Sequence, residues 1–218
     1  MRLLSVNIGK EQTIQAGKDS GKTCIFKNPT TIPVQITMDG LVGDSVTDKE
    51  NHGGDDQAVY VYSSLDYMWW SEALGKELAP GTFGENLTIS DLESATLQIG
   101  DRLRVGEVLL EVTSPRIPCV TLAARMEDPI FVKRFRQAER PGVYCRVIKT
   151  GIVRVDDPVN LERYQGDTLS ALEMFHNYYN KDASEADLRR ELAAPIAIRA
   201  RRENEERLNK LLAKSQAT

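Results

Sequence analysis

The sequence predicts a mainly β fold with added helices: a β-barrel or sandwich of short strands, followed by a small C-terminal three-helix domain. Two observations support this prediction. From Leu3 to about Leu161, short stretches of alternating apolar residues end at glycine or aspartate, which is typical of half-buried strands. After Tyr164-Gln165-Gly166 the strand signal stops, and helical patterns continue to the C-terminus. We therefore expect one domain over residues 1–163 and a second over residues 164–218.

Eight segments of the first part have the pattern of strands. Their apolar residues alternate with polar ones, so that one face of each strand would pack on a core. In chain order they are LLSVNIG (3–9), KTCIFK (22–27), PVQITMDGLVGD (33–44), AVYVYS (58–63), FGENLTI (83–89), ATLQIGDRLRVG (95–106), EVLLEVT (107–113) and GVYCRVIKTGIVRV (142–155).

Five segments have the pattern of helices. Two interrupt the strands and three follow them: SLDYMWWSEALG (64–75), DPIFVKRFRQAERPG (128–142), TLSALEMFHNYYN (168–180), SEADLRRELAA (184–194) and a last helix that starts near Pro195. Pro129 suits the first position of the second of these helices. Ser184 and Asp187 approximate a capping box at the start of the fourth.

The composition is that of an ordinary globular protein. Hydrophobic residues make up 41% and charged residues 28%, and no apolar run is long enough to span a bilayer. The start, MRLLSVNIGK, lacks a secretory signal pattern, so we expect a cytoplasmic protein with no membrane partner. The net charge of -4 gives no general attraction to nucleic acid, and we interpret the basic cluster IRARR (198–202) as a solvated helix face.

The cysteines point to a reducing compartment. Cys24, Cys119 and Cys145 are odd in number and far apart, which argues against a disulfide framework. The only histidines are His52 and His176, without ligand-like spacing to the cysteines, so a structural zinc site is not expected. Cys24 and Cys145 lie inside predicted strands, and we interpret them as buried structural residues. Cys119 lies at a strand end among loop residues, where a site is easier to build.

The segment SPRIPC (114–119) makes Cys119 the best candidate for a reactive thiol. Pro115 and Pro118 stiffen the backbone on either side of Arg116. A guanidinium close to a thiol favours the thiolate, which is the form that binds soft metals and attacks electrophiles. A buried, inert cysteine is the alternative, and the sequence alone leaves both open.

Three glycine-containing loops are candidates for ligand binding. AGKDSGKT (16–23) matches a Walker A motif if alanine replaces the first glycine, but the strand-like CIFKNPTTIP follows it where a P-loop needs a helix, so we interpret it as a hairpin. In NHGGDDQAVYVYS (51–63), two glycines follow a histidine and could form an anion-binding nest; a tight turn explains them equally well. In GTFGENLTI (81–89), Gly84 permits an unusual backbone angle, and Asn86 offers a donor and an acceptor to a polar heterocycle.

Taken together, NHGGDDQAVYVYS, FGENLTI followed by IGDRLRVG, and SPRIPC resemble the MOSC domain, a family named after the C-terminal domain of molybdenum cofactor sulfurases. The order HGG, FGENL and PRxPC is far more specific than any one of these motifs. The helical tail resembles the three-helix domain of the YiiM-type members, so the match covers nearly the whole chain. The resemblance implies a MOSC-type β-barrel with a cleft for the molybdenum cofactor, a molybdopterin.

The resemblance also implies a set of site residues. Cys119 corresponds to the family cysteine that carries sulfur or ligates molybdenum, and it is the expected metal ligand and catalytic residue. We expect His52, or Glu85 as an alternative, to relay a proton. The residues expected to bind the cofactor are His52, Gly53, Gly54, Asp55, Thr82, Phe83, Gly84, Glu85, Asn86 and Arg116.

The function implied is that of a molybdenum-cofactor oxidoreductase that reduces N–OH groups. Its small-molecule substrates would be N-hydroxylated purines such as 6-hydroxylaminopurine, detoxified with electrons from a separate flavoprotein, and thiolate suits the high-valent metal. One alternative is a sulfur carrier with a Cys119 persulfide, disfavoured because no fused PLP-dependent desulfurase domain is present. Another is a non-enzymatic adaptor that binds a cofactor or nucleic acid. We expect no stable nucleic-acid binding, and monomer and homodimer are both open.

Overall fold

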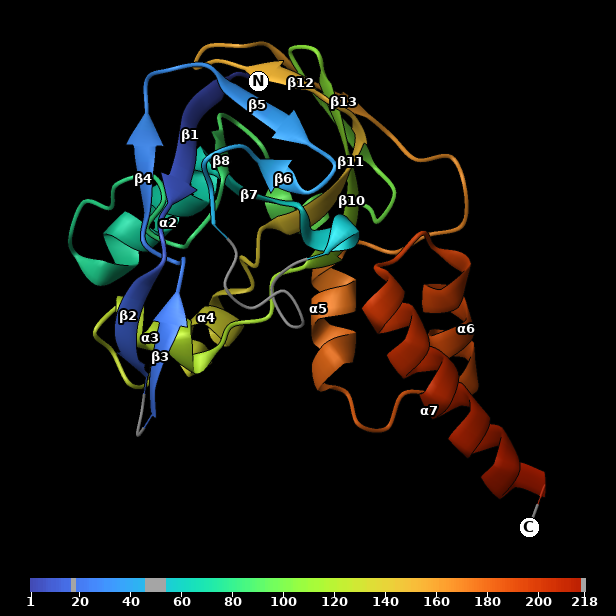
Figure 1. Cartoon of the computed structure of the whole chain (residues 1–218). Coiled ribbons are helices and arrows are strands. Elements are labelled where there is room, and N and C mark those ends of the chain that lie inside the picture. The colour runs from blue at the N-terminus through green and yellow to red at the C-terminus, as the bar shows by residue number, and fades with distance from the viewer. Residues whose placement is uncertain (17–18, 46–53, 217–218) are drawn as a thin grey trace.

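The computed structural model describes residues 1–16, 19–45 and 54–216. Its main element is an eight-stranded sheet. The strands are β1 (Leu3–Gly9), β4 (Lys27–Thr30), β7 (Val59–Ser63), β8 (Leu87–Ile89), β9 (Arg102–Val105), β10 (Val108–Pro115), β11 (Val143–Lys149) and β13 (Val159–Glu162). They pair in the order β13-β9-β10-β11-β7-β8-β1-β4, and all pairs are antiparallel except β7 with β8 (Figure 1).

Two smaller sheets complete the β structure. The strands β5 (Val34–Thr37), β6 (Gly40–Leu41) and β12 (Gly151–Val153) pair in the order β12-β5-β6. The strands β2 (Gln12–Ala16) and β3 (Asp19–Thr23) form an antiparallel pair. This pair confirms that AGKDSGKT belongs to a hairpin, because a strand stands where a P-loop would need a helix.

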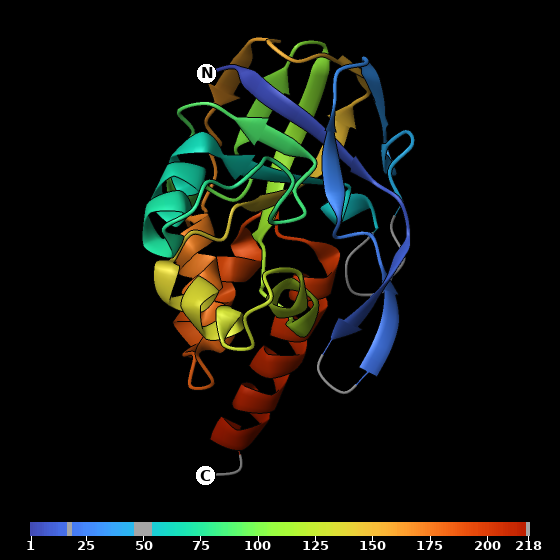
Figure 2. The same ribbon diagram turned by 90° about the vertical axis from the view of Figure 1, so that its left-hand side faces the viewer.

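The main sheet curves until its two ends approach each other (Figure 2). An isolated bridge joins Arg2 to Pro158, and the Leu3 N–H donates to the carbonyl oxygen of Asp157 at 3.0 Å. Among the described residues, however, no strand ladder closes the ring, and β13 and β4 remain the ends of the sheet order. The fold is therefore mixed α/β with one large curved sheet, and the expected closed barrel is not confirmed.

The strands bury side chains on both faces of the sheet, as β7 shows. Val59 and Val61 lie in an aliphatic core, whereas Tyr60 and Tyr62 lie in an aromatic cluster. This alternation follows from strand geometry, since successive side chains point to opposite faces. The helices α2 (Ser64–Leu74) and α4 (Phe131–Ala138) cover the aromatic side. It is on this aromatic side that Tyr60 reaches the candidate site.

The short helical elements differ in part from the expected ones. The helix α2 formed as expected, and it ends at a glycine, Gly75, in the left-handed conformation. The residue before α4 is Ile130, so Pro129 precedes the helix and does not occupy its first position. The helix α3 (Val120–Arg125) was not expected, and it begins directly after Cys119. Two 3-10 turns, η1 (Asp55–Gln57) and η2 (Ser94–Thr96), complete the list.

Three helices follow the sheet: α5 (Ala171–Tyr179), α6 (Glu185–Ala193) and α7 (Ile198–Gln216). They gather at one end of the sheet (Figures 1 and 2). The capping box of Ser184 and Asp187 is present and confirms that prediction. Within the part of the chain that the structure describes, no helix has both the length and the apolar character to cross a membrane.

The helical tail shares a core with the strands. Leu169, Ala171, Met174 and Ile196 are buried in the same aliphatic cluster as the strand residues. Removal of residues 164–218 would therefore expose apolar surface on the sheet, at a cost of about 25 cal/mol for each Å². Independent folding of residues 1–163 stays a prediction, and this shared core opposes it.

Candidate functional site

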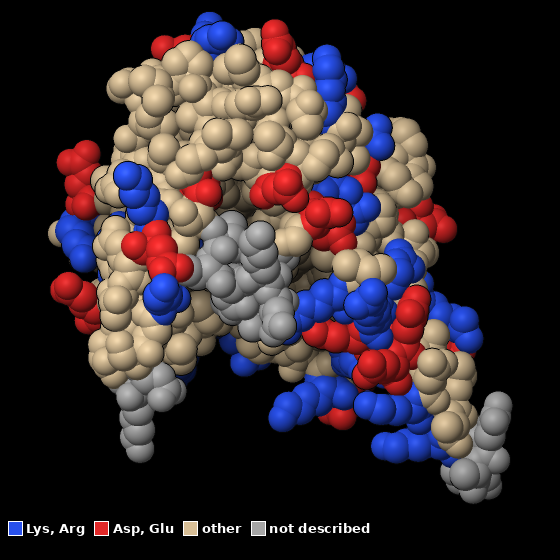
Figure 3. Space-filling model, in the orientation of Figure 1, with Lys and Arg blue, Asp and Glu red and all other residues tan. Residues whose placement is uncertain are grey.

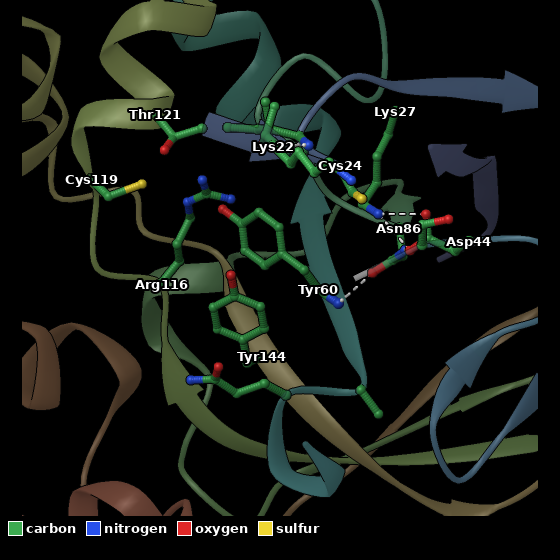
Figure 4. Close-up of a pocket in the computed structure, with 16 residues that line it drawn as sticks. Lys22, Cys24, Lys27, Asp44, Tyr60, Asn86, Arg116, Cys119, Thr121 and Tyr144 are labelled. Carbon is green, nitrogen blue, oxygen red and sulfur yellow. Dashed lines mark hydrogen bonds and ion pairs between the residues drawn. The ribbon is translucent and has the colours of Figure 1, made fainter. Parts of the chain in front are cut away.

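A cavity of about 150 Å³ lies between the β2–β3 hairpin and the loop that precedes α3 (Figure 4). Four residues predicted from the sequence line it: Gly84, Asn86, Arg116 and Cys119. They come from two segments that are separated by some 30 positions in the chain, so the fold brings the FGENL and PRxPC motifs to one place. We call this space the Arg116 cavity.

Cys119 lies in the wall of the Arg116 cavity and is half-buried. It occupies the position before α3 with an extended backbone, and its carbonyl oxygen accepts hydrogen bonds from the Leu122 and Ala123 N–H groups at 3.0 and 3.3 Å. Figure 4 shows its sulfur directed toward the Arg116 side chain. The thiol is thus held at a fixed point by the turn of the helix that follows.

The other two thiols differ from each other. Cys145 is fully buried in β11, and burial raises its pKa, so it stays protonated as expected of a structural residue. Cys24 is also buried, but it lies between β3 and β4 and lines the Arg116 cavity. The prediction that it lies inside a strand is wrong, because the strand KTCIFK is interrupted where the hairpin joins β4.

Arg116 is the buried cation of the cavity, with only 5% of its surface exposed. Its Nη1 donates to the carbonyl oxygen of Phe83 at 2.7 Å, its Cζ lies 5.0 Å from the centre of the Tyr60 ring, and its Nε has no hydrogen-bond partner among the described residues. Burial acts to lower its pKa, but nearby groups outweigh burial and raise it: Tyr144, Tyr60, Cys119 and the carboxyl of Glu85. Within the described residues no carboxylate forms a direct ion pair with this guanidinium, although the Glu85 carboxyl is close enough to act on its charge.

Two tyrosines with rings tilted against each other lie beside Arg116. The rings of Tyr60 and Tyr144 lie 4.9 Å apart, and both line the cavity (Figure 4). Burial raises the pKa of each phenol, and Arg116 offsets only part of that effect. Both hydroxyls therefore stay protonated at neutral pH.

On the side of the cavity opposite Cys119, buried polar side chains are joined by hydrogen bonds. The Lys27 Nζ donates to the Asp44 Oδ1 at 2.6 Å, and the Asn86 Nδ2 donates to the Asp44 Oδ2 at 2.8 Å. The Asn86 Oδ1 accepts from the Tyr60 N–H at 3.0 Å. Both ends of the Asn86 amide are thus engaged within the protein. Asn86 therefore shapes the wall, and the expectation that it presents free polar groups to a heterocycle finds no support.

Gly84 lets its loop pass close to Arg116. Its φ is 78°, and a Cβ there would lie 2.9 Å from the Ile25 Cγ1 and 3.5 Å from the Arg116 Nη1. Any side chain would meet both a strained backbone and a steric clash. This confirms that the position needs glycine, for close packing as well as for backbone angle.

Two neighbours of Gly84 and Asn86, namely Phe83 and Thr82, have side chains that lie away from the cavity. Phe83 is fully buried in the aromatic cluster, although its carbonyl oxygen holds Arg116. Thr82 borders a different cavity, and its hydroxyl donates to the Ala79 carbonyl oxygen at 2.6 Å. These two residues were expected to bind the cofactor, but the structure does not place their side chains at the Arg116 cavity.

Glu85 also lies apart from the cavity, fully buried. Its Oε1 accepts hydrogen bonds from the Tyr67 hydroxyl at 2.6 Å, the Gly81 N–H at 2.6 Å and the Thr88 hydroxyl at 2.9 Å. Burial raises the pKa of Glu85, and these hydrogen bonds offset only part of the rise. Glu85 therefore braces the loop in the structure, and its expected role in binding the cofactor or relaying a proton stays a prediction.

The raised pKa of the buried Glu85 predicts that the stability of the protein depends on pH. Because the folded-state pKa of Glu85 is raised, the folded protein holds more protons than the unfolded chain between the ordinary and the raised pKa, and stability falls as pH rises through that window. Glu85→Gln keeps an acceptor oxygen but has no charge to desolvate. We expect denaturant titrations from pH 4 to 8 to show the wild type losing stability relative to this variant. If the stability of the two proteins changed with pH in parallel, the pKa of Glu85 would not be raised in the folded state.

The glycine loop is described only in part. His52 and Gly53 lie outside the described residues, so their predicted roles stay predictions. Gly54, with a φ of 94°, and Asp55 are both exposed at the start of η1. Gln57 ends the same turn and does line the Arg116 cavity. The turn thus leads to the cavity, but neither Gly54 nor Asp55 is among the residues that line it.

Sequence reasoning missed several lining residues, among them Lys22, Gln57, Tyr60, Thr121 and Tyr144. Lys22 belongs to the hairpin that was identified only as glycine- and lysine-rich. The two tyrosines lie in predicted strands, where the pattern gives the alternation but not which face meets a cavity. Of these residues, only Gln57 could have been predicted, because it directly precedes the strand AVYVYS and adjoins the suspected glycine loop.

The basic cluster IRARR is engaged within the protein. The Arg199 Nε lies 3.1 Å from the Glu203 Oε1, and the Arg201 guanidinium donates to the carbonyl oxygens of Leu192 and Ala194 at 2.9 and 2.8 Å. Figure 3 shows charges of both signs interspersed along α7. The cluster is therefore a mixed-charge helix surface, and it does not form a single basic patch.

The curved sheet and the cysteine-bearing cavity define the class of the protein. The sequence profile of the MOSC domain matches residues 48–160, more than half of the chain, so the chain belongs to the MOSC domain family. This confirms the resemblance deduced from the HGG, FGENL and PRxPC motifs.

Within the family, the chain is similar to YiiM proteins. It is 32% identical to the protein YiiM of Escherichia coli over 162 residues, which cover 72% of this chain and 70% of that protein. It is 38% identical to the uncharacterized protein YflK of Bacillus subtilis over 160 residues, 73% of this chain and 72% of YflK. The crystal structure of YiiM from Geobacillus stearothermophilus superposes with a TM-score of 0.79 at 28% identity, over 95% of this chain and 98% of that one.

A third relative carries a functional name. A protein of Gibberella moniliformis named "Reductase" is 33% identical over 165 residues. The match covers 73% of this chain but only 29% of that protein. The similarity therefore concerns one part of a longer relative.

Proposed function

We propose that this protein is a molybdenum-cofactor-dependent reductase of N-hydroxylated compounds. Its substrate class is N-hydroxylated purines such as 6-hydroxylaminopurine, and its electrons come from a separate flavoprotein. The observation that carries the proposal is the half-buried Cys119 thiol in the wall of a cavity that also holds the unpaired cation Arg116. Membership of the MOSC family and the relative named a reductase support it.

The side chains of the cavity suit the anionic part of the cofactor, although the whole cofactor is larger than the cavity volume of about 150 Å³. A molybdopterin carries a phosphate, and the Nε of Arg116 is a buried donor that has no hydrogen-bond partner among the described residues. Lys22 lines the same cavity, and its exposed ammonium pairs with Glu11 at 2.6 Å. Cys119 offers the soft sulfur ligand that molybdenum prefers. Cys119 would therefore hold the metal and Arg116 the anionic part of the cofactor.

The reaction requires two electrons and two protons for each N–OH group. The N–O bond breaks, the nitrogen keeps its substituent and gains hydrogen, and the oxygen leaves as water. When bound, the molybdenum cofactor supplies a metal centre that can pass two electrons. The chain itself contributes the thiol of Cys119, the charge of Arg116 and the protonated phenols of Tyr60 and Tyr144 along the cavity wall. Proton relay by His52 remains part of the proposal.

The proposal predicts dependence on an external electron donor. The sequence contains no GxGxxG motif and no cysteine set for an iron–sulfur cluster, so direct electron transfer from NADPH is not expected. Cofactor-loaded protein should reduce 6-hydroxylaminopurine with a chemical reductant or an added flavoprotein, and be inactive with NADPH alone. The control is the same preparation without cofactor. Steady turnover with NADPH alone, in protein free of contaminating reductase, would overturn this part of the proposal.

A further inference from the structure

A second cavity adjoins the first at Cys119. It has a volume of about 310 Å³, and three residues line both cavities: Gln57, Cys119 and Tyr144. We call it the helix-side cavity, because α5 and α7 contribute Met174, Tyr178, Ala200 and other residues to its wall. Cys119 therefore lies in a partition between the two cavities.

The two cavities differ in chemistry. The Arg116 cavity is lined by Arg116, by Lys22 and by the ion pair of Lys27 with Asp44. Apolar groups dominate the helix-side cavity, among them Ile117 and Met174, and its charged residues, Arg199 and Glu203, pair with each other. Its volume lies at the lower end of the range for small-molecule sites, about 300–1,000 Å³. Such a space suits a compact, uncharged molecule better than an anion.

An exposed aromatic ring and an unpaired hydroxyl make the helix-side cavity more specific. Tyr178 lines it, and 56% of its surface is exposed, so a flat face is available for stacking against a planar ring. Ser114 also lines it, and the buried Oγ of Ser114 has no hydrogen-bond partner in the described residues. Gln57 adds an amide. Apolar walls with a few polar groups match a planar heteroaromatic ring with a polar edge.

The helices are held firmly at this place. The Ile198 N–H at the start of α7 donates to the Asp56 Oδ2 at 2.6 Å, and the Arg146 Nη2 donates to the Pro195 carbonyl oxygen at 3.1 Å. The Arg146 Nε lies 2.9 Å from the Asp56 Oδ1. Asp56 directly precedes Gln57, so the same turn that fixes α7 also forms the partition. The helical tail is therefore fixed in place and forms one wall of the helix-side cavity.

We infer that the heteroaromatic ring of the substrate binds in the helix-side cavity, stacked on Tyr178, with its N–OH group directed to the partition at Cys119. The inference rests on the proposed function, because it names the place and the recognition of the substrate for the same thiol. It gives the C-terminal helices a role in selecting substrates with a ring over small acyclic N-hydroxylated compounds. The Arg116 cavity is left to the anionic cofactor.

The test fills the helix-side cavity. Ala200→Phe on α7 should raise the KM for 6-hydroxylaminopurine at least tenfold, because the added ring takes the space of the substrate ring. Its turnover of acetamidoxime, a small acyclic N–OH compound, and its molybdenum content should stay within twofold of the wild type. Ala213→Phe, at an exposed position of the same helix, is the matched control and should change none of these.

Binding to cofactor-free protein separates this inference from the proposed function. Ligand-observed NMR with 6-hydroxylaminopurine should show binding to the wild type and to Ala213→Phe, and none to Ala200→Phe. If the wild type binds but does not turn over, the proposed function fails and the inference stands. If the wild type does not bind, or if Ala200→Phe binds equally well, the inference is overturned. Should Ala200→Phe not fold, Tyr178→Ala at an exposed position must weaken binding at least fivefold, and unchanged binding overturns the inference.

Discussion

Replacing Cys119 by serine should leave the fold intact and lower the reduction of N-hydroxylated substrates by about 100-fold or more. Serine is nearly the size of cysteine, and the half-buried position tolerates a hydroxyl. A serine hydroxyl, however, keeps its proton at neutral pH and is a poor ligand for a soft metal. Turnover of 6-hydroxylaminopurine and thermal unfolding of the same preparation measure the two effects.

The other cysteines are the controls. Cys145→Ser places a hydroxyl in a fully buried strand and should cost about 1–3 kcal/mol of stability while turnover of the folded protein is kept. Cys24→Ser should also keep turnover, although Cys24 lines the Arg116 cavity. Wild-type turnover in Cys119→Ser would place the metal site elsewhere. Loss of turnover only in Cys24→Ser would move it to the opposite wall of the same cavity.

Replacing Arg116 by methionine should lower the cofactor content of purified protein by about tenfold or more, the scale expected when a supporting contact of a metal site is lost. Methionine fills similar space but offers no donor to an anion. The fold should persist, since the change removes a buried charge that has no direct ion pair among the described residues and leaves one carbonyl, that of Phe83, without its donor, at about 1–3 kcal/mol. Molybdenum and pterin analysis gives the content directly.

Two further variants sharpen this result. Arg116→Lys keeps the positive charge but loses the planar set of guanidinium N–H donors. Its cofactor content should therefore lie between those of the wild type and Arg116→Met. Arg104→Met on β9 breaks an exposed pair with Glu162 on β13 and should leave the content unchanged. A full complement of cofactor in Arg116→Met would show that this guanidinium does not hold the anion.

The FGENL motif shows both how far the sequence could predict the site and where prediction failed. The motif was correctly assigned to the neighbourhood of Cys119, because Gly84 and Asn86 do line the Arg116 cavity. Its alternate residues, Phe83 and Glu85, are buried on the other side. An extended chain sends successive side chains to opposite faces, so one motif cannot deliver all its residues to one cavity.

The helices show a similar division between local and tertiary information. The capping box at Ser184 and the glycine end of α2 both follow from local chemistry, and the capping box was predicted. The helix α3 escaped prediction because six residues are too few for a periodic pattern. That Met174 would share a core with the strands, and that Ala200 would line a cavity with Cys119, depends on how α5 and α7 dock. No local pattern encodes that docking.

The central claim, that Cys119 ligates the metal of a bound molybdenum cofactor, is tested most directly by mapping alkylation of the three thiols by mass spectrometry. The protein is made in a host that synthesises the cofactor and is labelled before and after cofactor removal. The account predicts that Cys119 is protected in loaded protein and becomes the fastest-reacting thiol after removal, while labelling of Cys24 and Cys145 hardly changes. Equal labelling of Cys119 in both states, or protein that contains no molybdenum when isolated from that host, would contradict it.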